Sequence, residues 1–502
     1  MSDMNVTLHD SFENQPVYNK CGNYVKDLRK SKDGKVLLKL DLYNNLKNAA
    51  SRLNTIIKDL KPIQLGPGRP KPLDSAIEWR TVSTGKDKND EYISFNVSHY
   101  IGTLKLDIGT ENNVIFNIKP RFGEEVLGLL LEHAFSIYLP KDFSANVDSN
   151  TQTTHWLLPL LWRTRLSEAM AKFHIPREYQ QREGNLPTLK GRLLIGQHLR
   201  HNIVNQHLFY CSYYKYEYDN LINRAIRYSY RLLMEKEGMG NMIAEYEEFD
   251  NRLASFGVLD TVEKPEEIEK IRYTRMTEGY QPLMRLCQQI ISRQKSGVGG
   301  ENESIDSGFL VDISEIWENY ILKVLEKYLP QEGYNIVCPN HEDEETWLLE
   351  GSRREIRPDF LIYSNGECVA ILDAKYKYKD KIGYTSKEDG AISKEDIYAM
   401  NTYALHYHKP GQKMLCLFVT PEEMPTYKTE NEFNGLEKIK VDGPHEYSHS
   451  NDLKLGVIRM PLPKKNDNSI DDAILAHWID IWQQCFANTL MELIVNFKAK
   501  SK

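Results

Sequence analysis

The chain has 502 residues, of which 41% are hydrophobic and 27% are charged. This length and composition indicate a globular protein of about two to four domains, with enough apolar residues for sizeable cores. The formal net charge of −7 argues against a free-standing DNA-binding protein, because such proteins usually carry a strong basic excess.

The N-terminal part contains few clear signals before a β-rich stretch. A strand is predicted at 35–40 and a helix at 46–59, and the glycine and proline residues of 66–72 predict a turn or linker. From 92 to 120 we expect β-structure, because residues 93–97 alternate between apolar and polar side chains.

The middle of the chain is predicted to be mainly helical. Apolar residues recur at helical spacing in 124–139, 153–172, 218–237 and 266–295. The segment 296–304, rich in glycine, serine and glutamate, then marks the clearest domain boundary. The predicted regions are therefore 1–90, which is unassigned, 91–295, with strands followed by helices, and 305–502.

The C-terminal region alternates between helices and strands. The predicted helices are 312–329, 394–404 and 471–497, and the predicted strands are 357–363, 368–375, 413–419 and 455–460. This order predicts a mixed sheet flanked by helices, so we assign the chain to the α+β or mixed α/β class.

The cysteines and the hydropathy pattern indicate the cellular setting. Seven cysteines are scattered along the chain without a CxxC pair, which favours reduced thiols over a disulfide framework. The N-terminus is polar and lacks a signal-peptide pattern. No apolar run approaches the length of about 18 residues that a membrane span needs. We therefore expect a cytoplasmic protein without a membrane partner.

Two of the predicted C-terminal strands carry the residues with the clearest chemistry. Asn365-Gly366 between two apolar runs is a strong signal for a tight hairpin. Asp359 lies on the first strand, and Asp373 and Lys375 share one face of the second because strand side chains alternate. Two carboxylates can hold Mg²⁺ through oxygen ligands, and an ammonium can orient a water. The pattern indicates metal-assisted phosphodiester hydrolysis; the alternative is an ordinary hairpin with exposed charges.

The hairpin hypothesis makes a demand on strand register. A strict two-residue turn would set Asp359 opposite Leu372, and Asp359 would then point away from Asp373. The site therefore requires a bulge or bend near Pro358 and Asp359, or a longer turn. Bulges are common beside active sites.

The succession of Pro358-Asp359, a hairpin, Asp373 and Lys375 resembles the active site of the PD-(D/E)xK nuclease superfamily. The resemblance implies an endodeoxyribonuclease in which Asp359 and Asp373 bind Mg²⁺ and Lys375 positions the attacking water. The backbone carbonyl of Ala374 is a hypothetical further metal ligand.

The resemblance also extends to the helices on either side of the hairpin. In that superfamily a helix before the core sheet often supplies a glutamate near the metal, which makes Glu318 a candidate catalytic residue and metal ligand. A solvated helix charge is the alternative for Glu318, and Glu315 is its competitor. Many relatives carry a glutamine where Ala399 stands, so that role is unfilled or has moved to Asn401. Tyr403 matches a family tyrosine or is a buried core residue.

The middle of the chain carries a second set of signals. The segments 117–123, 189–195 and 218–225 precede the hairpin in a characteristic order. Taken singly, Lys190-Gly191-Arg192 is interpreted as a turn entering a strand, and Asn223-Arg224 as residues that cap or bridge helix packing. Together with the hairpin, this succession resembles the McrC family over roughly residues 90–410, whereas residues 1–90 match nothing clear.

The resemblance to McrC implies a specific division of labour. McrC proteins are the nuclease subunits of modification-dependent, type IV restriction systems. The region before the nuclease domain docks on a ring of AAA+ GTPase subunits, McrB, enters its pore and stimulates GTP hydrolysis. The sequence contains no GxxxxGK[ST] phosphate loop, which is consistent with another polypeptide supplying the motor.

We therefore expect a Mg²⁺-dependent endonuclease subunit of a McrBC-like system that cleaves double-stranded DNA together with a McrB-like AAA+ GTPase. Its C-terminal region would have the restriction-endonuclease-like fold. Two alternatives are a DNA nuclease that acts without a partner in defence or repair, and a non-catalytic protein that only stimulates a motor.

Overall fold

A computed structural model describes most of the chain after residue 90 and short segments before it. The described residues are 4–9, 15–16, 77–83, 91–97, 99–107, 113–120, 122–135, 137, 156–205, 207–235, 242–295, 305–341, 346–349, 355–376, 392–425, 439–448, 450–464 and 472–499. The predicted strand at 35–40, helix at 46–59 and linker at 66–72 lie outside them. Two compact units form, one from Met1–Thr153 with Phe309–Lys502 and the other from Thr154–Gly308.

The first unit contains a six-stranded mixed sheet, which confirms the predicted fold class. Its strands, in spatial order, are β11 (Tyr334–Val337), β12 (Phe360–Ser364), β13 (Glu367–Ala374), β14 (Met414–Pro425), β16 (Ser450–Lys464) and β15 (Val441–Tyr447). The three central strands β13, β14 and β16 run parallel, and the remaining pairs are antiparallel. Central parallel strands are normally buried on both faces, and every residue of β13 after Glu367 is buried.

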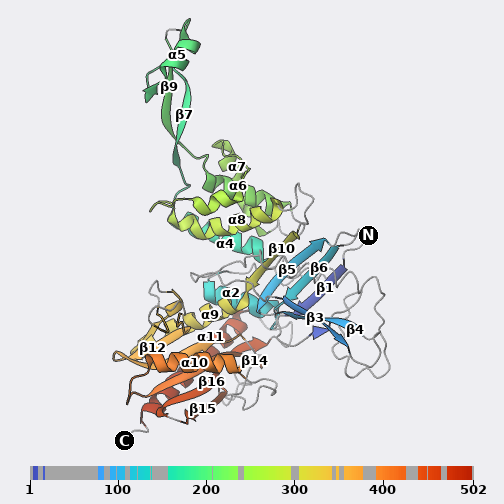
Figure 1. Cartoon of the computed structure of the whole chain (residues 1–502), viewed down its shortest axis with the longest axis vertical. Coiled ribbons are helices and arrows are strands. Elements are labelled where there is room, and N and C mark those ends of the chain that lie inside the picture. The colour runs from blue at the N-terminus through green and yellow to red at the C-terminus, as the bar shows by residue number, and fades with distance from the viewer. Residues whose placement is uncertain are drawn as a thin grey trace. The chain divides into compact units, whose positions relative to one another are not determined.

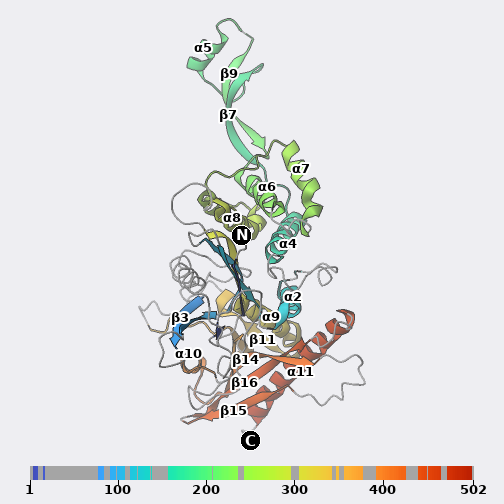
Figure 2. The same ribbon diagram turned by 90° about the vertical axis from the view of Figure 1, so that its right-hand side faces the viewer.

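Helices cover both faces of this sheet. Helix α10 (Lys394–Tyr407) lies on one side, and α11 (Asp472–Ala499) lies on the other (Figures 1 and 2). Met400 of α10 packs with Ile371 and Phe418 in a fully buried cluster. Helix α9 (Ile313–Tyr328) follows Asp312, its N-cap residue. The side chain of Asp312 accepts hydrogen bonds from the backbone N–H groups of Ser314 and Glu315.

A four-stranded sheet consists, in spatial order, of β1 (Met4–His9), β6 (Asn113–Lys119), β5 (Tyr100–Asp107) and β10 (Ile305–Asp312). Helix α2 (Gly123–Phe135) follows β6 in the chain. A smaller sheet holds β2 (Gln15–Pro16), β4 (Glu91–Val97) and β3 (Ile77–Ser83). These strands confirm the β-structure predicted for 92–120.

The pairing of β5 with β10 joins segments that are far apart in the sequence. Because β10 leads directly into α9, the strands after residue 91 group with the C-terminal part of the chain. The boundaries of the compact units thus differ from those of the predicted regions 1–90, 91–295 and 305–502. That these three regions fold as separate domains stays a prediction.

The second unit combines helices with a long hairpin. The helices are α4 (Leu157–Lys172), α6 (Leu221–Met234), α7 (Glu247–Ser255) and α8 (Gln281–Lys295). The hairpin consists of β7 (Glu178–Leu186) and β9 (Phe209–Glu217), and the connection between them contains β8 (Arg192–Leu193) and helix α5 (Ile195–Asn202). Figure 1 shows α5 at the end of this hairpin that is remote from α6 and α8.

The prediction of one helix over 266–295 is wrong. Short 3₁₀ turns at Pro265–Lys270 and Glu278–Tyr280 precede α8, which begins only at Gln281. The backbone N–H of Thr274 donates to the hydroxyl of Thr277 at 2.9 Å. Such local side-chain bonds give the backbone an alternative to helical hydrogen bonds, which explains the interruption.

Candidate active site

The predicted hairpin turn is present between β12 and β13. Asn365 has a φ of 54° and Gly366 a φ of 80°, as a two-residue turn with two left-handed residues requires. Ser364 pairs directly with Glu367 across the turn. The turn therefore has only two residues, and a longer turn does not solve the register problem.

A β-bulge close to the turn changes the register instead. Tyr363 pairs with Cys368, but the next residue of β12, Ile362, pairs with Ala370. Val369 is thus the extra residue of β13. A single inserted residue exchanges the faces of all the residues beyond it.

The shifted register continues to the open end of the hairpin. Phe360 pairs with Leu372, and one further step sets Asp359 opposite Asp373 rather than opposite Leu372. The expected irregularity is present, although it lies beside the turn and not near Pro358 and Asp359. The two predicted acids consequently meet on one face of the sheet.

Asp359 is held by hydrogen bonds to both of its carboxylate oxygens. Its Oδ2 accepts from the backbone N–H of Ala374 at 2.7 Å, and its Oδ1 accepts from Asn340 Nδ2 at 3.1 Å. The same amide nitrogen donates to Glu318 Oε1 at 2.8 Å. Asn340 therefore links Glu318 to Asp359, and all the predicted site residues belong to one connected group.

Asp373, which is buried, and Lys375, which is partly exposed, form an ion pair. Lys375 Nζ lies 2.9 Å from Asp373 Oδ1, and Asp373 is only 3% exposed. Burial, followed by the neighbouring carboxylate of Asp359, raises the pKa of Asp373 to about 8. Burial by itself would lower the pKa of Lys375, but the surrounding carboxylates outweigh that effect and raise it. The site thus gathers several carboxyl groups around one ammonium group.

The structure adds a residue that the sequence interpretation missed. Asp396, in the first turn of α10, places Oδ1 3.6 Å from Lys375 Nζ. Its other oxygen accepts a 2.7 Å hydrogen bond from the hydroxyl of Ser393, the N-cap residue of the helix. The spacing Ser393-x-x-Asp396 resembles a capping box, which was the available sequence signal for an ordered acid at this point.

The other candidates on α9 and α10 are now distinguishable. Glu318 is the α9 acid that shares a hydrogen-bond donor with Asp359, through the amide of Asn340. Burial first, and then the charges of Asp373 and Asp359, raise the pKa of Tyr403 to about 12. Tyr403 is therefore both packed against the core cluster and close to the acids.

Asn401, the alternative source of the polar group that is missing at Ala399, does not take part in this network. The buried Oδ1 of Asn401 has no hydrogen-bond partner among the residues that the structure describes. Ala399 has no polar side-chain atom to contribute. Asp396 instead gives α10 a polar contact with the site, through the ammonium of Lys375.

The donor set at the hairpin fits a divalent cation with oxygen ligands. The charge of Asp359 lies close enough to Asp373 to disfavour ionisation of the Asp373 carboxyl, and a cation would remove that repulsion. Within the described ranges, no group of three or more His, Cys, Asp or Glu side chains is placed so that it could hold a metal ion. The pair is therefore the primary binding unit, which suits Mg²⁺ because this ion usually keeps several waters and binds one or two carboxylates.

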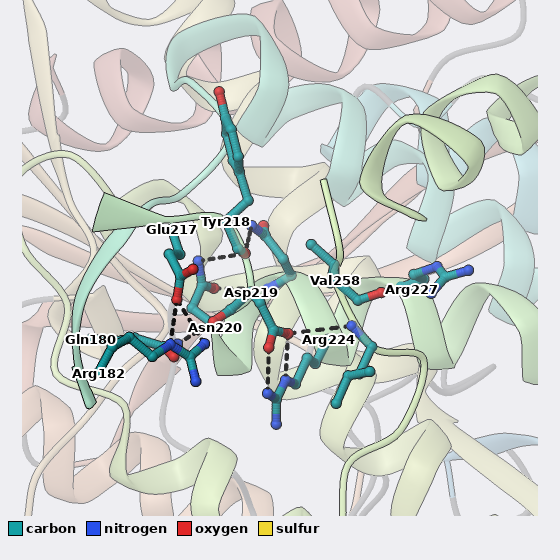
Figure 3. A network of polar contacts seen from close by, with 11 residues as sticks. Gln180, Arg182, Glu217, Tyr218, Asp219, Asn220, Arg224, Arg227 and Val258 are labelled. Carbon is teal, nitrogen blue, oxygen red and sulfur yellow. Dashed lines mark hydrogen bonds and ion pairs between the residues drawn. The ribbon is translucent and has the colours of Figure 1, made fainter. Parts of the chain in front are cut away.

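A second polar network fixes the base of the β7–β9 hairpin to helix α6 (Figure 3). The amide of Asn223, which is fully buried, donates to the carbonyls of Pro176 at 2.9 Å and of Tyr218 at 2.7 Å. Asn220 caps α6 and donates to the same two carbonyls. The segment before β7 and the segment after β9 are thus both hydrogen-bonded to the N-terminal end of α6.

Asp219 completes this network. Arg224 donates to its two oxygens from Nε at 2.6 Å and from Nη2 at 2.5 Å, and the backbone N–H of Leu259 donates at 3.2 Å. The hydrogen bonds from Arg224 hold the pKa of Asp219 below its usual value. Of the interpretation of Asn223 and Arg224 as capping or bridging residues, the bridging is borne out: Asn223 and Arg224 bond α6 to the segments at the base of the hairpin. The cap of α6 is Asn220.

The far part of the hairpin exposes apolar side chains. Ile195 and Leu199 of α5 and Ile203 after it recur at intervals of four, which places them on one helix face. Their exposed fractions are 66%, 58% and 71%. An exposed apolar group of this kind is typical of a surface that binds another protein.

Comparison with known proteins identifies the family. The family model described as the McrBC 5-methylcytosine restriction system component matches residues 95–418. The refined half-complex from a tetradecameric assembly of Thermococcus gammatolerans McrB AAA+ hexamers with bound McrC contains a chain with a similar fold. Its TM-score is 0.52 at 18% identity, over 95% of this chain and 100% of that chain.

A cryo-EM structure of the Thermococcus gammatolerans McrBC complex also matches, at 17% identity over 65% of this chain and 88% of that chain. Its TM-score of 0.38 is too low to indicate a shared fold. No curated protein sequence matches significantly. Because the family model spans more than half of the residues, the chain belongs to the McrBC family of 5-methylcytosine restriction system components.

Proposed function

We propose that this chain is the Mg²⁺-dependent endonuclease subunit of its restriction system and cleaves double-stranded DNA that carries modified cytosine. The observation that carries the proposal is the meeting of Asp359 and Asp373 on one sheet face with Lys375 beside them. Two carboxylates and an ammonium in this arrangement are the groups that metal-assisted phosphodiester hydrolysis needs.

Each residue has a role in that chemistry. Asp359 and Asp373 would hold Mg²⁺, with the carbonyl of Ala374 and the carboxylate of Glu318 as further ligands. When bound, Mg²⁺ supplies a nucleophile by lowering the pKa of a bound water, and it neutralises charge on the phosphate. Lys375 has donors beyond the one directed at Asp373, and they can hold the attacking water in line with the phosphorus atom.

The partner in this proposal is a McrB-like AAA+ GTPase whose hydrolysis the chain stimulates. Two observations support a protein partner: the family of the chain, and the exposed apolar face of Ile195, Leu199 and Ile203. We propose that region 91–295 docks on the GTPase through the hairpin that carries this face. The net charge of −7 favours a partner that holds the DNA.

The test is a cleavage assay on plasmids with and without 5-methylcytosine, in Mg²⁺ and GTP, with and without the AAA+ partner. Asp373→Ala and Lys375→Ala should each abolish cleavage and leave stimulation of GTP hydrolysis intact. Glu367→Gln, at the exposed start of the same strand, should cleave normally.

Each alternative predicts a different result. Cleavage by the purified chain alone would indicate a nuclease that needs no partner. Stimulated GTP hydrolysis without any cleavage would indicate a non-catalytic protein. Full cleavage by both the Asp373 and Lys375 variants would overturn the proposed site.

A further inference from the structure

Lys375 lies between two carboxylates that belong to different elements. Asp373, near the end of strand β13 that leads into Lys375, places Oδ1 2.9 Å from Nζ, and Asp396, on α10, places Oδ1 3.6 Å from it. The side chain of Asp396 is 15% exposed and that of Lys375 is 25% exposed. Both contacts are therefore shielded from bulk water, where such pairs are stronger than at the surface.

Hydrogen bonds with Ser393 fix the orientation of the Asp396 carboxylate. The hydroxyl of Ser393 donates to Asp396 Oδ2 at 2.7 Å, and the backbone N–H of Asp396 donates to Ser393 Oγ at 3.2 Å. One oxygen of the carboxylate is thus bound at the helix start, and the other is left facing Lys375. This reciprocal pair ties the direction of the carboxylate to the cap of α10.

Helical spacing indicates that the same face of α10 is turned toward the acids. Tyr403 lies seven residues after Asp396, two helical turns further along one face. The charges of Asp373, Asp359 and Asp396 all act on the phenol of Tyr403. Asp396 is thus part of the face that α10 presents to the site, not of its solvent face.

A lysine side chain is flexible, and its ammonium has no preferred direction of its own. A single partner, Asp373, would leave the ammonium free to rotate about that contact. A second carboxylate on another element, 3.6 Å from Nζ, restricts this rotation by electrostatic attraction. The ammonium keeps an N–H group for the attacking water.

We propose that Asp396 is a positioning residue for Lys375, which it holds in the orientation needed to direct the attacking water. The inference rests on the proposed nuclease function and adds a residue to it. Asp396 would act on the rate of cleavage through Lys375 and would not take part in metal or DNA binding.

The test compares Asp396→Asn, Asp396→Glu and Ser393→Ala with Glu395→Gln in the full chain with its AAA+ partner. Glu395 is an exposed neighbour in the same helical turn, so its variant controls for the loss of a negative charge at a helix N-terminus. Asp396→Asn should lower kcat for cleavage by about 10- to 100-fold, as loss of a supporting partner typically does, with KM for DNA unchanged. Asp396→Glu should recover part of kcat, and Ser393→Ala should lose less than Asp396→Asn.

A second readout does not depend on cleavage. Mg²⁺ that binds only the folded chain raises Tm, and this rise should persist in Asp396→Asn but disappear in Asp373→Ala. If Asp396→Asn cleaves within about twofold of Glu395→Gln, or loses the Mg²⁺-dependent rise in Tm, the positioning role is wrong. If Asp373→Ala still cleaves, the nuclease site itself is wrong and the inference fails with it.

Discussion

Asp359 accepts a 2.7 Å hydrogen bond from the backbone N–H of Ala374, across the open end of a hairpin whose turn is Asn365-Gly366. This bond exists because the bulge at Val369 shifts the register of the two strands by one residue. Without the shift, Asp359 would point to the other face of the sheet, and the backbone of Ala374 would have no carboxylate beside it.

Replacement of Asn340 should impair cleavage without unfolding the chain. Its amide is the shared donor between Glu318 and Asp359, so Asn340→Ala leaves two neighbouring carboxylates without it. We expect a loss of about tenfold in cleavage rate, in the range seen for partners of metal ligands, together with a higher Mg²⁺ requirement. Asn335→Ala, at an exposed position of β11, is the matched control. An Asn340→Ala chain with native rates at low Mg²⁺ would contradict this role.

Replacement of Gly366 tests the turn. Gly366→Ala adds a β-carbon to a residue with a φ of 80° that has open space around it, so only backbone strain is introduced. We expect the free energy of unfolding of the first unit to fall by about 1 kcal/mol, measured by urea denaturation. Gly366→Asn should lose less, because asparagine tolerates the left-handed region. Equal losses for the two variants would show that strain is not the cause.

Asn223→Ala should destabilise the second unit. The buried amide serves two backbone carbonyls at the base of the hairpin, and its loss leaves them with fewer donors in a site closed to water. The expected cost is about 1–3 kcal/mol in the free energy of unfolding, measured by denaturant titration. Asn205→Ala, at an exposed position, should change stability by no more than about 0.5 kcal/mol.

The stability of the second unit should depend on pH through Asp219. Hydrogen bonds from Arg224 lower the pKa of Asp219 in the folded chain below its ordinary value of 3.8. The stabilisation is therefore fully present above pH 3.8 and is lost as the pH falls through the lower, folded-state pKa. Urea midpoints measured from pH 7 downward should fall less steeply for Asp219→Asn than for the native chain. The control is Glu183→Gln on the exposed surface of β7, which should keep the native slope.

The apolar face of α5 should matter for binding and not for stability. Leu199 is 58% exposed, so Leu199→Asp removes little buried area from the chain itself. It should weaken association with the AAA+ partner and reduce stimulation of GTP hydrolysis by at least about tenfold, as burial of an unpaired charge at an interface does. Gln197→Asp, which introduces the same charge into the same helix, should have a smaller effect. Equal effects would indicate that charge, rather than the apolar face, governs docking.

The family resemblance was predictable because it depends on the order of short segments along the chain. The hairpin with its Asn365-Gly366 turn, the helix predicted over 312–329, and the helices and strands of the C-terminal sheet all follow from patterns of a few residues. The failure at 266–295 has the same origin. A helical pattern of apolar residues is present there, but threonine side chains bond to the backbone locally and interrupt it.

Residue type and local spacing therefore determined which groups this chain can bring to a site: two acids, a lysine, and a turn between them. Only the tertiary structure decided which of these groups meet. The bulge at Val369 has no local sequence signature, and Asn340 and Asp396 reach the hairpin from a separate loop and helix. Strand register and helix packing depend on how the whole core is filled, so contacts between distant segments cannot be derived from any one segment.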